Sequence, residues 1–298
     1  MAKIAVELEQ ALTRRRARGE PGRAVGRAIA GGAGWTVADV LCTSGPEDRS
    51  FEERHTRYTI AIVVAGSFQY RSPLGHGFMA PGSLLLGNSG HCYECGHRHG
   101  AGDRCVSFYY QPEYFERLAR DAGGPRGGGG LCFTVPRLPP LRPLASVVAR
   151  AAAGVVGAPG MSWEELAVTL AGGAVKLAAG LSWEDEALPR NAEARMTHAV
   201  RAIEQRPDGD LSLGTLARES GLSPYHFLRT FERLTGTTPH QFVLRARLRA
   251  AATRLRTEPG RVIDAALDAG FGDVSNFNRA FRAEFGMPPR AFLEHSGR

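Results

Sequence analysis

Short apolar runs separated by turn residues dominate the first half of the chain. Four of them are rich in β-branched and aromatic residues: 58–66 (YTIAIVVAG), 67–72 (SFQYRS), 82–87 (GSLLLG) and 104–110 (RCVSFYY). Gly, Pro, Ser and Asn separate these runs, which is the pattern of strands joined by tight turns. Strands this short and this closely spaced predict an antiparallel sandwich or small barrel between residues 35 and 111.

The pattern changes to helical periodicity further along the chain. Ser162 and Glu165 form a Ser-x-x-Glu capping box in front of an apolar periodic run, which predicts a helix ending near residue 180. Gly172 and Gly173 inside that run permit a close approach of another helix. Glycine-rich and proline-rich stretches on either side indicate connecting segments, namely a flexible loop over 120–130, a connector over 135–143 and a linker over 181–194.

An internal repeat organises the last hundred residues. Segments 227–242 and 277–292 both read F-x-R-x-F-x4-G-x2-P-x2-F, at an offset of fifty positions. Such a match indicates two similar structural units. The intervening segment 239–256 is rich in arginine and predicts one long helix that joins the units.

Each unit has the helix-capping residues of a helix-turn-helix. In the first, Ser223 is placed to cap a second helix that opens with Pro224, and in the second Asp273 has the same place. The phenylalanines of each repeat are four residues apart and should face a core, so Arg229 and Arg279 between them should face solvent or a ligand. A helix-turn-helix places its second helix in the major groove of DNA.

These motifs carry a resemblance to a known family. Residues 200–293 resemble the DNA-binding domain of the AraC/XylS family, on the segments LSLGTLARESGLSPYHFLRTFERLTGTTPHQF, RLRAAATRL and DAGFGDVSNFNRAFRAEFGMPPRAF. On the segments RHTRYTIAIVVAGSFQYRS and MAPGSLLLG, residues 50–115 resemble the cupin-like sensory half of the same family. This resemblance implies that His55 lies near where an effector pocket would open. The resemblance implies that seven residues face DNA: Tyr225, His226, Arg229 and Arg233 in the first unit, with Ser275, Asn278 and Arg279 in the second.

Composition and charge agree with a nucleic-acid partner. The formal net charge is +7 with a pI near 9.5, and Lys3 and Lys176 are the only lysines among the basic residues. Arginine suits bidentate contacts to phosphate and guanine. The sequence has neither a run of eighteen apolar residues nor the apolar core of a secretion signal at its N-terminus, so we expect a cytoplasmic protein without a membrane partner.

Cysteine and histidine crowd into one stretch, 90–108 (GHCYECGHRHGAGDRCVSF). Cys-x-x-Cys supplies two thiolates, and a glycine-rich turn would bring a third back beside them. Thiolates and imidazoles in a tetrahedral array favour Zn²⁺ or another soft ion. The predicted ligands are Cys92, Cys95 and Cys105, with His97 or His99 as the fourth.

Other interpretations of this stretch remain open. The thiols could be a redox or electrophile sensor, since Cys-x-x-Cys thiols beside His and Arg104 can have a lowered pKa. They could also be small buried apolar residues of a hairpin, as expected for the isolated Cys42 and Cys132. A cupin-type metalloenzyme fused to a DNA-binding module is a further alternative, but no catalytic motif is present and leucines 84–86 stand where cupin histidines are usual.

The sequence therefore predicts an α+β protein of two domains that regulates transcription and is not an enzyme. A basic, flexible arm (1–34) precedes a cupin-like sensory domain (35–135), a helical linker or dimerisation region (136–190) and a DNA-binding domain (191–298) with two helix-turn-helix units joined by a long helix. The resemblance implies promoter DNA as the partner, a homodimer, and RNA polymerase as a further partner.

Overall fold

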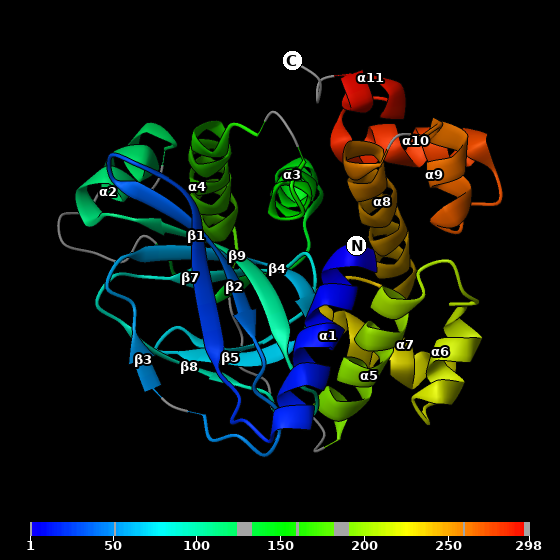
Figure 1. Ribbon diagram of the computed structural model, residues 1–298, viewed down its shortest axis with the longest axis horizontal. Helices are drawn as coiled ribbons and strands as arrows, with labels where there is room; N and C mark the ends of the chain where they lie inside the picture. Colours follow the sequence, from blue (N-terminus) through cyan, green and yellow to red (C-terminus); the bar gives the residue numbers. More distant parts are fainter. Residues whose placement is uncertain are drawn as a thin grey trace.

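The computed structural model describes residues 2–50, 52–123, 133–158, 161–181, 191–258 and 260–294. A two-sheet β-sandwich is followed by helices that pack on it, and then by an all-helical part (Figure 1). The strands are β1 (Ala24–Gly32), β2 (Trp35–Cys42), β3 (Glu52–Arg54), β4 (Tyr58–Gly66), β5 (Phe68–Ser72), β6 (Gly75–Met79), β7 (Leu84–Gly87), β8 (Cys92–Gly96), β9 (Asp103–Tyr110) and β10 (Arg137–Leu138). The helices are α1 (Ala2–Arg18), α2 (Pro112–Asp121), the 3-10 helix η1 (Arg142–Leu144), α3 (Ala145–Val155), α4 (Trp163–Ala179), α5 (Ala192–Gln205), α6 (Leu213–Glu219), α7 (Pro224–Thr235), α8 (Pro239–Thr257), α9 (Val262–Asp268), α10 (Val274–Phe285) and α11 (Pro289–Glu294).

The two sheets explain why β4 is an unbroken apolar run. One sheet has the strand order β1-β2-β9-β4-β7-β10 and the other the order β3-β8-β5-β6, and the strands of the described residues pair antiparallel. Ile60 and Ile62 of β4 face the core under the helices, whereas Ala61 and Val63 face the space between the sheets. Because successive side chains point to opposite faces, a strand buried on both faces must be apolar throughout. The predicted fold class is confirmed.

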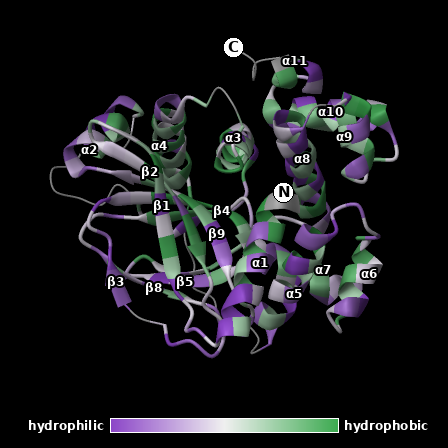
Figure 2. Ribbon diagram, in the orientation of Figure 1, coloured by the Kyte–Doolittle hydropathy of each residue, from purple (hydrophilic) through white to green (hydrophobic). Residues whose placement is uncertain are grey.

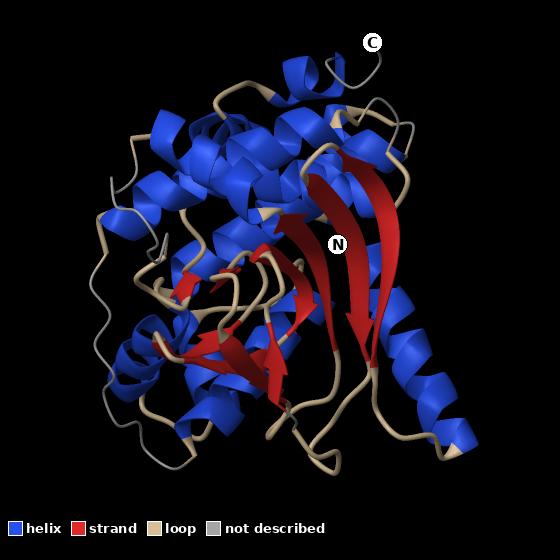
Figure 3. Cartoon of the chain, turned by 90° about the vertical axis from the view of Figure 1, so that its left-hand side faces the viewer, coloured by secondary structure: helices blue, strands red, loops and turns tan. Residues whose placement is uncertain are grey.

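Helices cover the outer face of the larger sheet (Figure 3). Helices α3 and α4 are mostly apolar, in contrast to the more hydrophilic strands β3 and β8 (Figure 2). The Ser162 hydroxyl accepts a hydrogen bond from the Glu165 amide and begins α4, as predicted. A Cβ at Gly173 would lie 2.9 Å from Leu144 Cδ2, so this glycine lets α4 approach η1 closely.

The prediction of a flexible arm over residues 1–34 is wrong for the part of it that the structure describes. Residues 2–18 form α1, whose Ile4, Leu8 and Leu12 are fully buried against the sandwich. Their spacing of four residues puts them on one helical face. The glycine-rich segment that follows forms β1, which pairs with β2 along its whole length. Backbone pairing of this kind needs no large side chains.

The C-terminal part contains the two predicted helix-turn-helix units, α6–α7 and α9–α10, joined by α8. The Ser223 hydroxyl caps α7, and the Asp273 carboxylate caps α10 by accepting from the amides of residues 275 and 276. Both second helices end at a glycine in the left-handed region, Gly236 with φ 77° and Gly286 with φ 76°. The repeat seen in the sequence is therefore a repeat of caps as well as of core residues.

The sandwich and the helix-turn-helix units share apolar cores. Phe78 and Ala80 at the end of β6 are buried in the cluster that holds the first unit together, with Phe227 and Phe231 of α7. Ala149 of α3 is buried in the cluster of the second unit. Each unit thus rests on a different element of the N-terminal part.

Three predicted features fall wholly or mainly outside the described residues: most of the 120–130 loop, Cys132, and the linker between Leu181 and Asn191. Within the described residues, no helix is both long and apolar enough to cross a membrane.

Candidate nucleic-acid interface and barrel cavity

The predicted DNA-facing residues lie on the outer faces of α7 and α10. All seven are exposed, and Tyr225 is 66% exposed although it is aromatic. Phe227, Phe231, Phe277 and Phe281 are fully buried on the opposite faces. The side chains of Arg229 and Arg279 form no ion pair within the described part of the chain. The geometry allows both arginines to reach a ligand, and their contact with DNA stays a prediction.

A basic groove lies beside α10, the second helix of the second unit. It has a volume of about 820 Å³, and Asn278 and Arg279 from α10 line it. Three further arginines surround it, from the loop before α9, from α10 and from α11: Arg261, Arg282 and Arg290. Sequence reasoning did not select these three, because they become neighbours only when α9, α10 and α11 pack together.

The arginines of α8 are mostly used inside the protein. Arg249 is buried and its Nη2 lies 3.3 Å from Glu204 Oε1 on α5. Arg247 donates to the carbonyl oxygens of Pro207 and Gly209, and Arg245 donates to that of Pro140. These arginines therefore hold α8 against α5, the segment before α6 and the connector at Pro140, and do not form a continuous DNA-facing stripe.

A direct seam joins β10 and the following residues to the end of α7. The Arg137 side chain is buried, and its Nη2 donates to the Leu234 carbonyl at 2.8 Å. Burial lowers the pKa of Arg137 to about 10. A Cβ at Gly236 would lie only 2.4 Å from Pro139 Cβ. The N-terminal part thus makes direct contacts with the C-terminal end of α7.

A second candidate site is a cavity of about 160 Å³ inside the sandwich. His55 lines it, stacks on Tyr93 with ring centroids 4.0 Å apart, and has its Nε2 3.0 Å from the Tyr70 hydroxyl. Burial lowers the pKa of His55 to about 4, with a smaller contribution from the charge of His91, so the imidazole is neutral at pH 7. His55 therefore lines an interior cavity of the sandwich, and its role in binding an effector stays a prediction.

The structure contradicts the prediction that Cys92 and Cys95 supply two thiolates to one ion. Residues 92–96 form strand β8, in which side chains alternate, so Cys92 and Cys95 lie on opposite faces. Nor do Cys95 and Cys105 sit opposite each other on a hairpin, because β8 and β9 belong to different sheets. Cys95 and Cys105 both line the cavity, whereas His99 lies 4.0 Å from Glu193 of α5.

The structure brings together a different group that could hold a metal: Cys42, His97 and Asp103. One ligand atom from each lies within 4.8 Å of the other two, and all three atoms are buried. Cys42 and Asp103 are direct neighbours across the β2–β9 ladder. His97 Nε2 lies 2.7 Å from Asp103 Oδ1, and Cys105 Sγ donates to the other carboxylate oxygen at 3.3 Å. Of the five predicted ligands, only His97 belongs to this group.

The surroundings of the thiols do not favour redox chemistry. Burial and the nearby Asp103 carboxylate raise the pKa of Cys42 to about 11, and burial also raises the pKa of Cys95 and Cys105. Arg104, which was expected to lower a thiol pKa, instead makes two hydrogen bonds to Asp39 and one to Glu7. Reactive cysteines need stabilised thiolates, and these three thiols lack that stabilisation.

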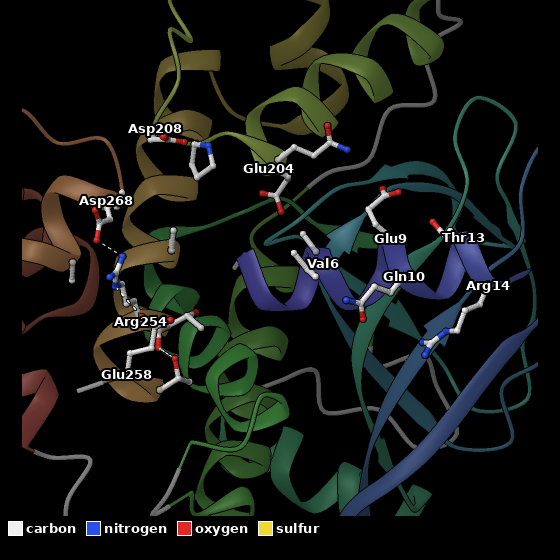
Figure 4. Close-up of a pocket in the computed structure, with 18 residues that line it drawn as sticks. Val6, Glu9, Gln10, Thr13, Arg14, Glu204, Asp208, Arg254, Glu258 and Asp268 are labelled. Atoms are coloured by element: carbon white, nitrogen blue, oxygen red, sulfur yellow. Dashed lines mark hydrogen bonds and ion pairs between the residues drawn. The ribbon is translucent and has the colours of Figure 1, made fainter. Parts of the chain in front are cut away.

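A further groove, of about 710 Å³, opens at the junction of the two parts. Val6, Glu9, Gln10 and Arg14 of α1 form one wall, and residues from α5, α8 and α9 form the other (Figure 4). Arg254 bridges α8 and α9 through an ion pair with Asp268 (Figure 4). The N-terminal helix therefore lies across this groove from α5, α8 and α9.

Comparisons with known proteins match both parts. Residues 40–170 match the AraC-like ligand binding domain, and residues 216–295 match a helix-turn-helix domain. Regulatory protein SoxS of Salmonella typhimurium is 33% identical over 90 residues, which are 30% of this chain and 84% of SoxS. The transcriptional activator NphR of a Rhodococcus species is 38% identical over 107 residues, or 35% of this chain and 31% of NphR. The regulator MtrA of Neisseria gonorrhoeae is 25% identical over 105 residues, or 35% of each chain, so the match spans about a third of these two relatives.

Solved structures were matched over both a large and a small part of the chain. ToxT of Vibrio cholerae O395 is 13% identical with a TM-score of 0.36, and the match covers 89% of this chain and 99% of ToxT. The DNA-binding domain of AdpA, solved in complex with a target DNA, is 26% identical with a TM-score of 0.33 and covers 34% of this chain and 90% of that one. On the family matches to both parts and the coverage of SoxS, the chain belongs to the AraC family of transcriptional regulators.

Proposed function

We propose that this protein is a sequence-specific, DNA-binding transcriptional regulator that is controlled by a ligand bound in its N-terminal sandwich. The observation that carries the proposal is the repeated placement of an exposed arginine, Arg229 and Arg279, on the second helix of two equivalent units. Families of this kind regulate transcription and are not enzymes, which agrees with the expectation from the sequence.

The length of α8 suits binding to one face of DNA. A helix of 19 residues is about 28 Å long at 1.5 Å per residue. Major grooves on one face of B-DNA recur about every 34 Å. We therefore propose that α7 and α10 enter successive major grooves, with Tyr225, His226, Arg229 and Arg233 at one and Ser275, Asn278 and Arg279 at the other. A homodimer would read a longer site, and RNA polymerase would be the partner on the promoter.

We further propose a revised domain division. The sensory domain begins with α1 and extends through α4, because these helices share one core with the sandwich. The DNA-binding domain begins with α5, which is buried with α6, α7 and α8. A ligand in the sandwich would act through the contacts of Phe78, Ala149 and Arg137 with this domain.

The test is a binding experiment on DNA selected from a random duplex pool by the wild-type protein. A bidentate contact between arginine and guanine is worth about 1–3 kcal/mol. Arg229→Ala and Arg279→Ala should each weaken binding to the selected duplex and relax the preference at one base pair. Arg218→Ala is the control, because Arg218 is an exposed arginine on the first helix of the first unit. Unchanged base preference in both recognition-helix variants would contradict the proposal.

A further inference from the structure

We propose that Cys42, His97 and Asp103 bind a zinc ion, and that this ion positions the loop 97–103 against α5 of the DNA-binding domain. The inference rests on the proposed function only in its second half, since metal binding itself does not require DNA. It replaces the ligand set expected from the sequence with one that spans both sheets.

The distances fit a single ion. Zinc binds thiolate sulfur at about 2.3 Å and imidazole or carboxylate atoms at about 2.0–2.2 Å, so two ligands of one ion lie at most about 4.6 Å apart. The three ligand atoms already lie within 4.8 Å of one another. Only small side-chain movements are needed to close the site.

The chemistry of the three ligands selects the class of metal. A thiolate with an imidazole and a carboxylate suits zinc and similar borderline ions, whereas calcium and magnesium require oxygen ligands. Binding would release the Cys42 thiol proton to solvent, because the thiolate is the ligand. Three protein ligands leave a fourth position for water or for a donor atom of an effector in the cavity.

The fold already holds the ligands in place. Cys42 and Asp103 are fixed side by side by the β2–β9 ladder, and Cys105 Sγ donates to Asp103 Oδ2. A side chain at Gly66 would lie 2.3 Å from the Gly102 carbonyl oxygen, so β4 also confines the chain directly before Asp103. Outer hydrogen bonds of this kind orient metal ligands.

The loop between two of the ligands lies on α5. His97 and Asp103 lie at the two ends of this loop, and three residues between them contact one face of α5. His99 Nε2 lies 4.0 Å from Glu193, a Cβ at Gly100 would lie 2.9 Å from Thr197, and the Ala101 carbonyl accepts from Arg201. Glu193, Thr197 and Arg201 recur every four residues and so share that face.

Helix α5 connects this loop to the first recognition helix. Met196, Val200 and Ile203 of α5 are fully buried in the same cluster as Phe227 and Phe231 of α7. A change in the position of the 97–103 loop would therefore reach α7 through one packed helix. Zinc is expected to change the affinity for DNA by about fivefold or more, the lower end of typical coupling between two sites.

The first experiment measures zinc binding alone. The full chain is prepared under reducing conditions, dialysed against zinc and analysed for metal content. Wild type and Cys92→Ser should retain about one zinc per chain. Cys42→Ser and His97→Gln remove a ligand and should lose more affinity than the roughly 10–100-fold that the loss of an outer hydrogen-bonding partner costs. Circular dichroism identifies a variant that fails to fold, and two different ligand variants keep the test decisive.

Two results would overturn the site: wild-type protein without stoichiometric zinc, or zinc lost from Cys92→Ser and kept by Cys42→Ser. The second experiment titrates the selected DNA duplex with and without zinc. Arg201→Ala should keep its zinc but lose the effect of zinc on DNA affinity. An unchanged zinc effect in this variant would overturn the coupling through α5. Zinc binding by a protein without any DNA preference would refute the proposed function and leave the metal site intact.

Discussion

Gly236 and Gly286 occupy equivalent positions in the repeat, but they differ in the atoms that would surround an added Cβ. Both end a recognition helix in the left-handed region, with φ of 77° and 76°. Among the described residues, a Cβ at Gly286 would meet no atom within 4 Å, whereas a Cβ at Gly236 would lie 2.4 Å from Pro139 Cβ and 3.1 Å from its Cγ. Alanine substitution at the two sites therefore separates two losses of stability: the loss from the left-handed backbone conformation, and the loss from the clash with Pro139.

The expected losses of stability follow from the backbone conformation and from the contact with Pro139. A non-glycine residue in the left-handed region costs about 1–2 kcal/mol, so Gly286→Ala should lose about that much stability. Overpacking a tight contact adds about 1–3 kcal/mol, so Gly236→Ala should lose about 2–5 kcal/mol. Urea unfolding of the full chain measures both losses.

A double-mutant cycle tests the assignment to Pro139. In a Pro139→Gly background the clashing Cβ and ring atoms are absent, so the additional loss of Gly236→Ala should disappear while the backbone cost remains. Equal losses for Gly236→Ala and Gly286→Ala in the wild-type background would refute the reasoning. The seam would then not be a tight contact.

Two further predictions concern buried arginines. Arg137→Ala should lower the stability of the α7 end by about 2 kcal/mol, since a hydrogen bond from a charged donor is worth about 1.5–3 kcal/mol. Hydrogen exchange of the amides near residue 236 measures this loss. The control is Arg142→Ala, which removes an exposed arginine 3.9 Å from Glu284 and should change the exchange of these amides little. Asp39→Asn should cost about 3 kcal/mol at pH 7 because it breaks a buried pair with Arg104. Burial raises the Asp39 pKa, but the hydrogen bonds and charges of Arg104 and, to a smaller extent, Arg27 outweigh burial and hold that pKa below 3.8. The stabilisation is therefore present above about pH 4 and is lost as the pH falls through the folded-state pKa, so urea unfolding at pH 7 and pH 3 should show a smaller difference between wild type and variant at pH 3. A difference that does not depend on pH would contradict this.

The helix-turn-helix units could be predicted from the sequence because their signals are local. The caps Ser223 and Asp273 and the terminal glycines lie within a few residues of the helices that they define. The two sheets could be predicted as a class from the short apolar runs. The pairing of particular strands could not, because it depends on contacts between distant segments.

The metal-ligating group shows this limit most clearly. Cys42 and Asp103 are 61 positions apart in the sequence, and only the β2–β9 register makes them neighbours. The Cys-x-x-Cys spacing suggested two thiolates for one ion, but Tyr93 and its neighbours extend to pair with β3 and β5, which separates the two thiols. For α1, the spacing of Ile4, Leu8 and Leu12 was visible in the sequence, but its buried partner surface was not.

The shared apolar clusters have a consequence for exchanging parts between related regulators. Phe78 and Ala80 complete the core of the first helix-turn-helix unit, and Ala149 completes that of the second. A chimera that joins this DNA-binding half to a foreign sensory half would expose those surfaces unless the new partner supplies similar side chains at the same places. Exchange of the two halves is therefore restricted to sensory halves whose β6 end and α3 face match this DNA-binding half. Hybrids should fold when Phe78, Ala80 and Ala149 are transferred together with the DNA-binding half.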